Sequence, residues 1–322
     1  MYFLKIKAWL LLATLVAFAL AATACGGESA GGGPGGGGVN LSGASFTVGS
    51  KEFTEQRILG QIAIQALQAA GAEVTDQTGI QGTANVRRAL NAGEIDMYWE
   101  YTGTGWTTHL GHEASEAPRG TQQLYEAVAT EDLQRNQVRW LQPAPMDNAY
   151  AIATAQGRDQ QLGVRTLSDY AALANRDPAQ ASLCAATEFL TRDDGLPGLQ
   201  QVYGFTLPPN EISEVDLGVI YTRVPSGDPC NFGEVFATDG RIVANKLQIL
   251  EDDKQFFVKY NVAMTVNDEV FSRYPQLAQV LNPIAAKLTN ETMRAMNARV
   301  DVEGLLPEQV AQEFLEQHAL IS

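Results

Sequence analysis

The most informative segment for the fold is EIDMYWEYTGTGW, which spans Glu94 to Trp106. It begins as a strand, contains three aromatic residues within four positions, and meets glycines at positions 103 and 105. A strand that ends in a glycine-broken loop places side chains at the edge of a sheet, where α/β proteins hold their ligands. Its aromatic rings are costly to leave in water, so we expect them to face either a core or a bound molecule.

Strands and helices alternate around this segment. The order strand, helix, strand, helix, strand indicates a parallel sheet with helices on its faces, and hence an α/β fold. The expected strands are Ser45–Ser50, Ala72–Thr75 and the start of the quoted segment, and the expected helices are 53–70 and 83–90.

A second α/β unit follows, from Tyr150 to about Asp253. We expect a strand over 182–186 and another over 234–242 that ends in a turn. The chain then returns to the first unit through an apolar strand over 256–266 that contains Tyr260, followed by four helices. The expected organisation is therefore lobe 1 over 44–149, lobe 2 over 150–255, and a returning segment of lobe 1 over 256–322.

The N-terminus is expected to be a targeting segment. Lys5 and Lys7 precede an apolar stretch over 8–22, which is too short for a confident membrane span and leads to small residues before Cys25. Residues 1–25 resemble a bacterial lipoprotein signal in which Cys25 is lipidated, although Ala22 stands where leucine is usual. An ordinary cleaved secretory signal is the alternative. Residues 26–43 contain GGGPGGGG and are expected to be a flexible linker.

Composition and motifs exclude several functions. The formal net charge of −15 over 322 residues argues against nucleic-acid binding. No serine-hydrolase elbow, phosphate loop or zinc-protease motif is present, and the chain has three histidines, so we expect no catalytic residues, no metal and no cofactor. In an exported chain, Cys184 and Cys230 favour a disulfide, with two separate buried thiols as the alternative. An exported two-lobed protein with a flexible linker and no catalytic motif is typical of a binding protein with its ligand between the lobes.

Five short motifs occur in one order along the mature chain. The motifs are GSKEFTEQ at 49–56, YTGT at 101–104, NAY at 148–150, TDGRI at 238–242 and LEDDK at 250–254. Together they resemble the glycine betaine/choline/carnitine substrate-binding proteins of osmoprotectant ABC importers, over about residues 45–320. This resemblance implies a type II periplasmic-binding fold, two lobes with mostly parallel sheets that close on a quaternary ammonium, and delivery of that ligand to a membrane permease.

The resemblance also implies the ligand contacts. Members of the family surround the trimethylammonium group with aromatic rings, because a quaternary nitrogen has no N–H to donate, whereas aromatic faces attract its charge. The matching rings are Tyr101, Tyr150, Phe236 and Tyr260. Phe236 departs from the family's usual tyrosine, which keeps the ring but loses the hydroxyl.

Polar contacts carry over in the same way. Thr104 and Asn148 match polar contacts beside the first two rings, and Lys51 and Arg192 match the cations that receive a betaine carboxylate. Lys51 could instead be a solvated lysine at a helix start, and Arg192 a surface ion-pair partner. Tyr150 and Tyr260 could be plain core rings. We assign Tyr98, Trp99 and Trp106 to packing.

The expected protein is thus a monomeric, lipid-anchored binding protein on the extracytoplasmic face of the cell membrane. The expected ligand is glycine betaine or a relative, and the sequence does not separate choline, carnitine or proline betaine from it. Lys51 and Arg192 favour a ligand with a carboxylate, because choline would leave both without an anionic partner. Two other functions remain open at this point. One is a sensory or adaptor module with the same fold, and the other is an exported enzyme acting on a small cationic substrate.

Overall fold

The computed structural model describes residues 39–321, and residues 39–322 form one compact unit. The expected signal peptide, Cys25 and most of the expected linker lie outside the described residues. Packing begins before the expected end of the linker at Gly43. Leu41 is 1% exposed and donates its backbone N–H to the Ala70 carbonyl at 2.7 Å, because its apolar side chain fills a place in the first core. None of the helices in the described part is long and apolar enough to cross a membrane.

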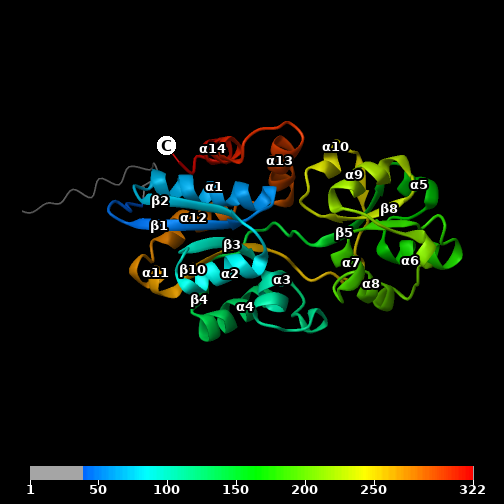
Figure 1. Cartoon of the computed structure of the whole chain (residues 1–322), viewed down its shortest axis with the longest axis horizontal. Coiled ribbons are helices and arrows are strands. Elements are labelled where there is room, and N and C mark those ends of the chain that lie inside the picture. Colours follow the sequence, from blue (N-terminus) through cyan, green and yellow to red (C-terminus); the bar gives the residue numbers. More distant parts are fainter. Residues whose placement is uncertain (1–38, 322) are drawn as a thin grey trace, which may run out of the picture. The chain divides into compact units, whose positions relative to one another are not determined.

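The first lobe is built on a five-stranded sheet in the order β2-β1-β3-β10-β4 (Figure 1). Strands β1, β2 and β3 are parallel, whereas β10 runs antiparallel to both of its neighbours. The elements are β1 (Ser45–Lys51), α1 (Thr54–Ala69), β2 (Glu73–Ile80), α2 (Thr83–Ala92), β3 (Met97–Tyr101), α3 (Thr102–Thr104), η1 (Gly105–His109), η2 (Ala114–Glu116), α4 (Thr121–Asn136), β4 (Val138–Trp140), β10 (Val262–Asn267), α11 (Asp268–Arg273), α12 (Leu277–Ala285), α13 (Asn290–Asp301) and α14 (Pro307–Gln317).

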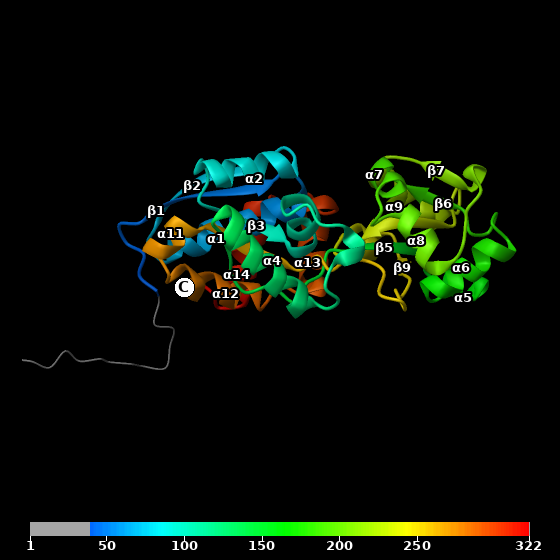
Figure 2. The same cartoon turned by 90° about the horizontal axis from the view of Figure 1, so that it is seen from below.

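Alternate residues of β3 face opposite sides of this sheet, as the strand period of two requires. Met97, Trp99 and Tyr101 join the core beneath α1 and α12–α14, whereas Tyr98 packs on the other side with α2 and α4. Figure 2 shows α2 and α12 on opposite sides of the strands. Tyr98 and Trp99 are almost fully buried and Trp106 is 9% exposed.

The second lobe has a five-stranded sheet in the order β7-β6-β8-β5-β9, in which β5 runs antiparallel to both neighbours. Cys184 on β6 and Cys230, which precedes β8, are joined by a disulfide with Cα atoms 5.5 Å apart. The elements are β5 (Tyr150–Ala155), α5 (Arg158–Leu162), α6 (Leu167–Arg176), β6 (Leu183–Ala185), α7 (Thr187–Thr191), α8 (Leu196–Tyr203), η3 (Pro209–Glu211), β7 (Ile212–Glu214), α9 (Leu217–Ser226), β8 (Phe232–Phe236), α10 (Arg241–Ala244) and β9 (Leu247–Ile249).

Two chain segments connect the lobes, and they pair with each other. The backbone N–H of Asn148 donates to the Tyr260 carbonyl at 3.1 Å, and Asp147 and Asn261 form an antiparallel bridge. The Asp147 carboxylate also accepts from the Tyr260 backbone N–H at 2.8 Å. Both crossings are therefore tied together where the cavity described below begins.

The end of the 94–106 segment differs from expectation. The chain does not enter a glycine-broken loop after Tyr101 but continues into the short helices α3 and η1. Gly103 and Gly105 have no positive φ, so their role is close packing and not turning. A Cβ atom at Gly103 would lie 2.7 Å from the Tyr260 ring, and one at Gly105 would lie 2.6 Å from Val128.

Two expected strands are also shorter than predicted. The strand over 256–266 begins only at Val262, because residues up to Asn261 form the crossing segment, so Tyr260 lies before β10 and not within it. The strand over 234–242 ends at Phe236, and Arg241 begins the short helix α10. The intervening Thr-Asp-Gly turn packs against α13, where a Cβ atom at Gly240 would lie 2.2 Å from the Ala298 backbone nitrogen.

Candidate functional site

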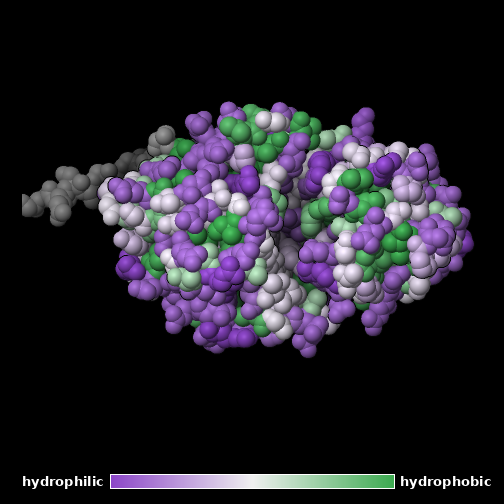
Figure 3. All heavy atoms as spheres, in the orientation of Figure 1, coloured by the Kyte–Doolittle hydropathy of each residue, from purple (hydrophilic) through white to green (hydrophobic). Residues whose placement is uncertain are grey.

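A cavity of about 600 Å³ lies where residues of the two lobes meet. Figure 3 shows a groove at the surface over this place. The volume falls in the range of ordinary small-ligand sites. Its lining includes every ligand-binding residue predicted from the sequence, namely Lys51, Tyr101, Thr104, Asn148, Tyr150, Arg192, Phe236 and Tyr260. The structure thus brings together side chains that are up to 209 positions apart (260 − 51).

One pair of stacked rings comes from the first lobe. Phe53 and Tyr101 lie with centroids 6.4 Å apart and planes 20° from parallel. Phe53 immediately precedes α1 and is 41% exposed, which is unusual for a phenylalanine, and it lines the cavity. The Lys51 Nζ atom lies 5.1 Å from the centroid of the Tyr101 ring. The sequence prediction missed Phe53, although it belongs to the first motif.

A second pair of stacked rings comes from the second lobe. Tyr150 on β5 and Phe236 on β8 are directly opposite in the antiparallel ladder, with ring centroids 5.2 Å apart and planes 22° from parallel. Phe189 packs edge-on against Tyr150 at 5.3 Å. Phe236 therefore has a definite place in the aromatic wall, because cross-strand pairing fixes it beside Tyr150.

Tyr260 supplies a ring from the crossing segment. Its hydroxyl donates to the Asp194 carboxylate at 2.9 Å, and the absent side chain of Gly103 leaves room for its ring. Burial raises the pKa of the Tyr260 hydroxyl well above its usual value, as does the nearby Asp194 charge, so the tyrosine stays neutral and acts as the donor. Asp194 was not among the predicted site residues.

Each cation in the cavity wall has a carboxylate partner within the protein. Lys51 Nζ lies 2.6 Å from Glu100, and Arg192 makes a bidentate pair with Asp194 at 2.7 and 2.6 Å. Arg241 is paired in the same way with Asp239 at 2.9 and 2.6 Å. The two cations that were expected to receive a ligand carboxylate are therefore already neutralised, although Arg192 keeps its Nη1 donors outside the pair.

The Lys51 pair is part of a buried network behind the Tyr101 ring. Glu100 is fully buried and accepts from Lys51 and, at 2.9 Å, from the Tyr98 hydroxyl, and His109 lies 2.8 Å away. Burial by itself raises the pKa of the Glu100 carboxyl, but the charges and hydrogen bonds of Lys51 and His109 outweigh it and hold the pKa at about 2. Glu100 is therefore ionised at neutral pH, which fixes Lys51 in place.

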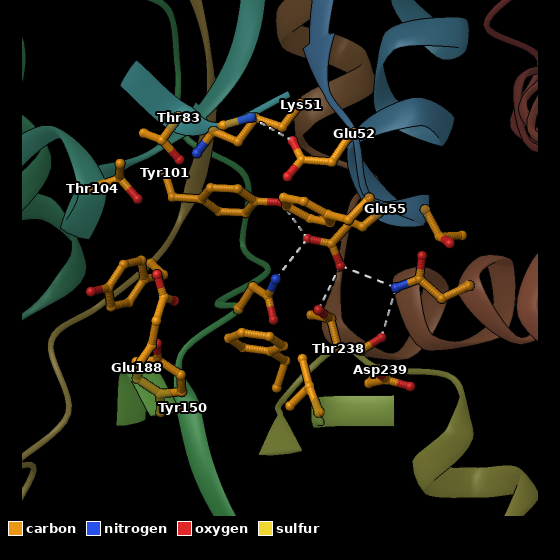
Figure 4. A pocket seen from close by; sticks show the side chains of 18 of the residues that line it. Lys51, Glu52, Glu55, Thr83, Tyr101, Thr104, Tyr150, Glu188, Thr238 and Asp239 are labelled. Carbon is orange, nitrogen blue, oxygen red and sulfur yellow. Dashed lines mark hydrogen bonds between the residues drawn. The ribbon is translucent and has the colours of Figure 1, made fainter. Parts of the chain in front are cut away.

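Glu55 lies at the centre of the cavity wall, between Tyr101 and Thr238 (Figure 4). Its carboxylate accepts four hydrogen bonds, two on each oxygen. The donors are the Tyr101 hydroxyl at 2.7 Å, Asn148 Nδ2 at 3.0 Å, the Thr238 hydroxyl at 2.5 Å and Asn297 Nδ2 at 3.1 Å. Glu55 was not predicted as a site residue, because its place in the first motif was taken only as a helix start.

The two predicted polar residues Thr104 and Asn148 both line the cavity but differ in their surroundings. Thr104 is half-buried in α3 and lines the cavity. Asn148 uses its Nδ2 atom on Glu55, while its Oδ1 atom is buried without a hydrogen-bond partner among the described residues. Such an unpaired acceptor in a cavity wall can meet a positively polarised ligand group. Across residues 39–321, no group of three or more His, Cys, Asp or Glu side chains could hold a metal ion.

A family model described as the substrate binding domain of ABC-type glycine betaine transport system (OpuAC) matches residues 44–317. The chain belongs to this family. The OpuAC match covers both lobes and both crossings, and hence the whole cavity.

Individual relatives agree with this assignment. The glycine-betaine-binding protein of Pseudomonas aeruginosa is 38% identical over 283 residues, which cover 85% of this chain and 88% of the relative. The glycine betaine-binding protein YehZ of Escherichia coli K12 is 34% identical over 274 residues, with 84% and 89% covered. The solved structure of apo YehZ from E. coli has a TM-score of 0.74 at 33% identity, with 86% of this chain and 99% of that chain covered.

Membership of the OpuAC family confirms the resemblance and the type II periplasmic-binding fold expected from the sequence. The protein is an extracytoplasmic substrate-binding protein of an ABC-type transport system, and it binds its substrate without converting it. The cavity lined by residues of both lobes is the candidate substrate site.

Proposed function

We propose that this protein captures glycine betaine, or a close quaternary ammonium relative, in an aromatic cage and delivers it to an ABC import permease. The observation that carries the proposal is the convergence of Tyr101, Tyr150, Phe236 and Tyr260 on one cavity. Relatives that cover most of this chain are named as glycine betaine-binding proteins. The four rings come from both lobes and from a crossing segment, so the cage is complete only when the lobes are folded against each other.

The cage suits a trimethylammonium group because its walls are aromatic faces. A desolvated cation–π contact stabilises a complex by about 2 kcal/mol, so three or four rings are enough for micromolar binding. Arg192 is the proposed contact for a ligand carboxylate, through the Nη1 donors that its pair with Asp194 leaves free. Lys51 has two further N–H donors beyond its bond to Glu100 and lines the same wall.

The direct test is calorimetric titration of residues 39–322 with glycine betaine, choline, carnitine and proline. We expect heat from the quaternary ammonium compounds and none from proline, whose secondary ammonium carries N–H groups that need acceptors. No binding of any quaternary ammonium would refute the cage. Choline binding as tightly as glycine betaine would remove the carboxylate role from Lys51 and Arg192.

We further propose that the protein acts as a monomer anchored to the extracytoplasmic face of the membrane through a lipid on Cys25. The support is the sequence around Cys25 and the glycine-rich stretch that follows it. Cys25→Ala is expected to release the protein from the membrane fraction or to leave its signal uncleaved. Membrane retention of a correctly cleaved Cys25→Ala protein would contradict the anchor. Light scattering of residues 39–322 tests the monomer.

A further inference from the structure

Glu55 is a buried carboxylate whose four hydrogen-bond donors are all neutral. The residue is 3% exposed, and its four hydrogen-bond partners are two hydroxyls and two amides. Among residues 39–321, no lysine, arginine or histidine forms an ion pair with it, in contrast to Glu100 and Asp194. Burying a charge without a counter-ion is expensive, so such a group calls for an explanation.

Four hydrogen-bond donors favour the ionised form of Glu55. Burial is the largest effect on the Glu55 carboxyl and leaves its pKa raised, although the hydrogen bonds from Thr238, Tyr101 and Asn297 act in the opposite direction; the nearby Asp239 charge adds to the rise. Asn148 and Asn297 present amide N–H groups, which can only donate. A carboxylate has about four lone-pair sites, and four donors fill them. The ionised oxygens are thus satisfied, while the negative charge itself has no partner within the described protein.

The charge lies against one cage ring and is held by donors that neighbour two others in the sequence. Tyr101 donates to it directly, Asn148 stands two residues before Tyr150, and Thr238 stands two residues after Phe236. The latter two rings are stacked on each other. Figure 4 shows Glu55 between the Tyr101 side of the cavity and the Thr238 side.

No other group in the cavity wall can neutralise this charge. Lys51, Arg192 and Arg241 each form an ion pair at 2.6 Å with a different carboxylate, namely Glu100, Asp194 and Asp239. Glu52, Glu188 and Asp301 add further acidic groups to the lining, but these side chains are partly or fully exposed and therefore screened by water.

We propose that Glu55 supplies the counter-charge for the quaternary nitrogen of the ligand and is a specificity-determining residue of the cage. This inference rests on the proposed function. Because all four lone-pair sites are filled, Glu55 attracts a cation without offering an acceptor to it. A primary ammonium would need such acceptors, whereas a trimethylammonium group has no N–H to satisfy. Glu55 therefore matches a fully alkylated nitrogen in both charge and hydrogen bonding.

The test compares residues 39–322 with three variants by calorimetric titration with glycine betaine. Glu55→Gln keeps the shape but removes the charge, and we expect Kd to rise about tenfold or more, the loss that about 1.4 kcal/mol produces. Thr238→Val removes one hydrogen bond and keeps the charge, so its loss should be clearly smaller. Glu234→Gln is the matched control, because Glu234 is another buried glutamate (2% exposed) that does not line the cavity. Circular dichroism checks that each variant is folded.

A second probe separates charge from structure. In 3,3-dimethylbutanoate a carbon atom replaces the quaternary nitrogen of glycine betaine, so a purely structural defect in Glu55→Gln weakens both probes alike. We expect Glu55→Gln to weaken the binding of glycine betaine by a factor at least about tenfold larger than that of the isostere. Equal losses, or a Glu55→Gln loss no larger than that of Thr238→Val, overturn the inference. If the isostere binds neither protein, the comparison with Thr238→Val decides.

Two other outcomes need separate treatment, namely a parent protein that does not bind glycine betaine and a Glu55→Gln variant that does not fold. If the parent protein does not bind glycine betaine, the proposed function fails and not merely the role of Glu55. If Glu55→Gln does not fold, carboxyl ¹³C NMR of the parent replaces it. Saturating glycine betaine should then lower the titration midpoint of Glu55. Asp239, Arg241, Lys51 and the other charged groups of the wall are present with and without ligand, so the change in midpoint reports the ligand. An unchanged midpoint overturns the inference.

Discussion

Adding one methyl group at Gly103 should displace a ring of the cage. Gly103 lies in α3, and a Cβ atom at this position would come within 2.7 Å of two atoms of the Tyr260 ring. Ordinary carbon–carbon contacts are about 3.5–4.0 Å, so the ring must move by roughly 1 Å. The Tyr260 hydroxyl is held at 2.9 Å from Asp194, and a shift of that size takes it outside hydrogen-bonding range.

The expected magnitude has two parts. Overpacking a buried site usually destabilises the fold by about 1–3 kcal/mol, whereas alanine in place of glycine in a helix offsets about 1 kcal/mol of this. Binding suffers separately, because a displaced ring loses its contact with the ligand. The loss of one cation–π contact of about 2 kcal/mol raises Kd by more than tenfold.

A double-mutant cycle with Tyr260→Ala isolates the clash. Chemical unfolding gives the free energy of unfolding and calorimetry gives Kd for Gly103→Ala, Tyr260→Ala and the double variant. We expect Gly103→Ala to destabilise the parent but not the Tyr260→Ala protein, where space is free. Gly218→Ala is the control, since it is another helical glycine, and its Cβ atom would meet only the flexible Arg241 side chain, at 3.3 Å.

Two results would contradict the predicted clash between Gly103→Ala and Tyr260 or the role of Tyr260 in the cage. If Gly103→Ala destabilises both backgrounds by the same amount, the clash with Tyr260 is not its cause. If Gly103→Ala binds glycine betaine as the parent does, then Tyr260 either tolerates the shift or contributes nothing to the cage.

Three further predictions concern other parts of the molecule. Tyr101→Ala should raise Kd for glycine betaine about tenfold or more, as measured by calorimetry. Binding as tight as that of the parent would contradict the proposed position of the cage. Burial raises the pKa of Glu234 to about 7. Because this pKa is higher in the folded than in the unfolded protein, the stability that Glu234 contributes is lost as pH rises from about 4.5 to 7. Glu234→Gln should therefore stabilise the protein above pH 7 and have no such effect below pH 4.5. Thermal unfolding at several pH values checks this. Reduction of the Cys184–Cys230 disulfide should increase the intact mass by two hydrogens and, for its sequence separation of 46, destabilise the fold by about 4 kcal/mol.

The sequence predicted much of the fold and the residues that line the cavity. The aromatic-rich start of the 94–106 segment predicted β3, and the order of strands and helices predicted an α/β lobe, because such patterns are local. The five motifs placed Tyr101, Tyr150 and Tyr260 in the site through their resemblance to a family. Even Phe236, which departs from that family's usual tyrosine, lines the cavity beside Tyr150.

What the side chains do there could not be read from the sequence. Lys51 was predicted to meet a ligand carboxylate, which stays a prediction. The sequence did not show that it also pairs with Glu100, which is 49 positions away and reaches it because β1 and β3 are neighbours in the sheet. Glu55 looked like an ordinary residue at a helix start. Its role depends on donors from β3, a crossing segment, the second lobe and α13.

The same distinction applies to the glycines of the opening segment. The sequence determined that positions 103 and 105 lack side chains, and it suggested a turn. The tertiary structure alone decided why, since the space is taken by Tyr260 and by residues near α4 that approach from elsewhere in the chain. Local pattern therefore determined which elements form and which residues gather. Long-range packing decided which charges are paired, and it leaves Glu55 with neutral hydrogen-bond donors only.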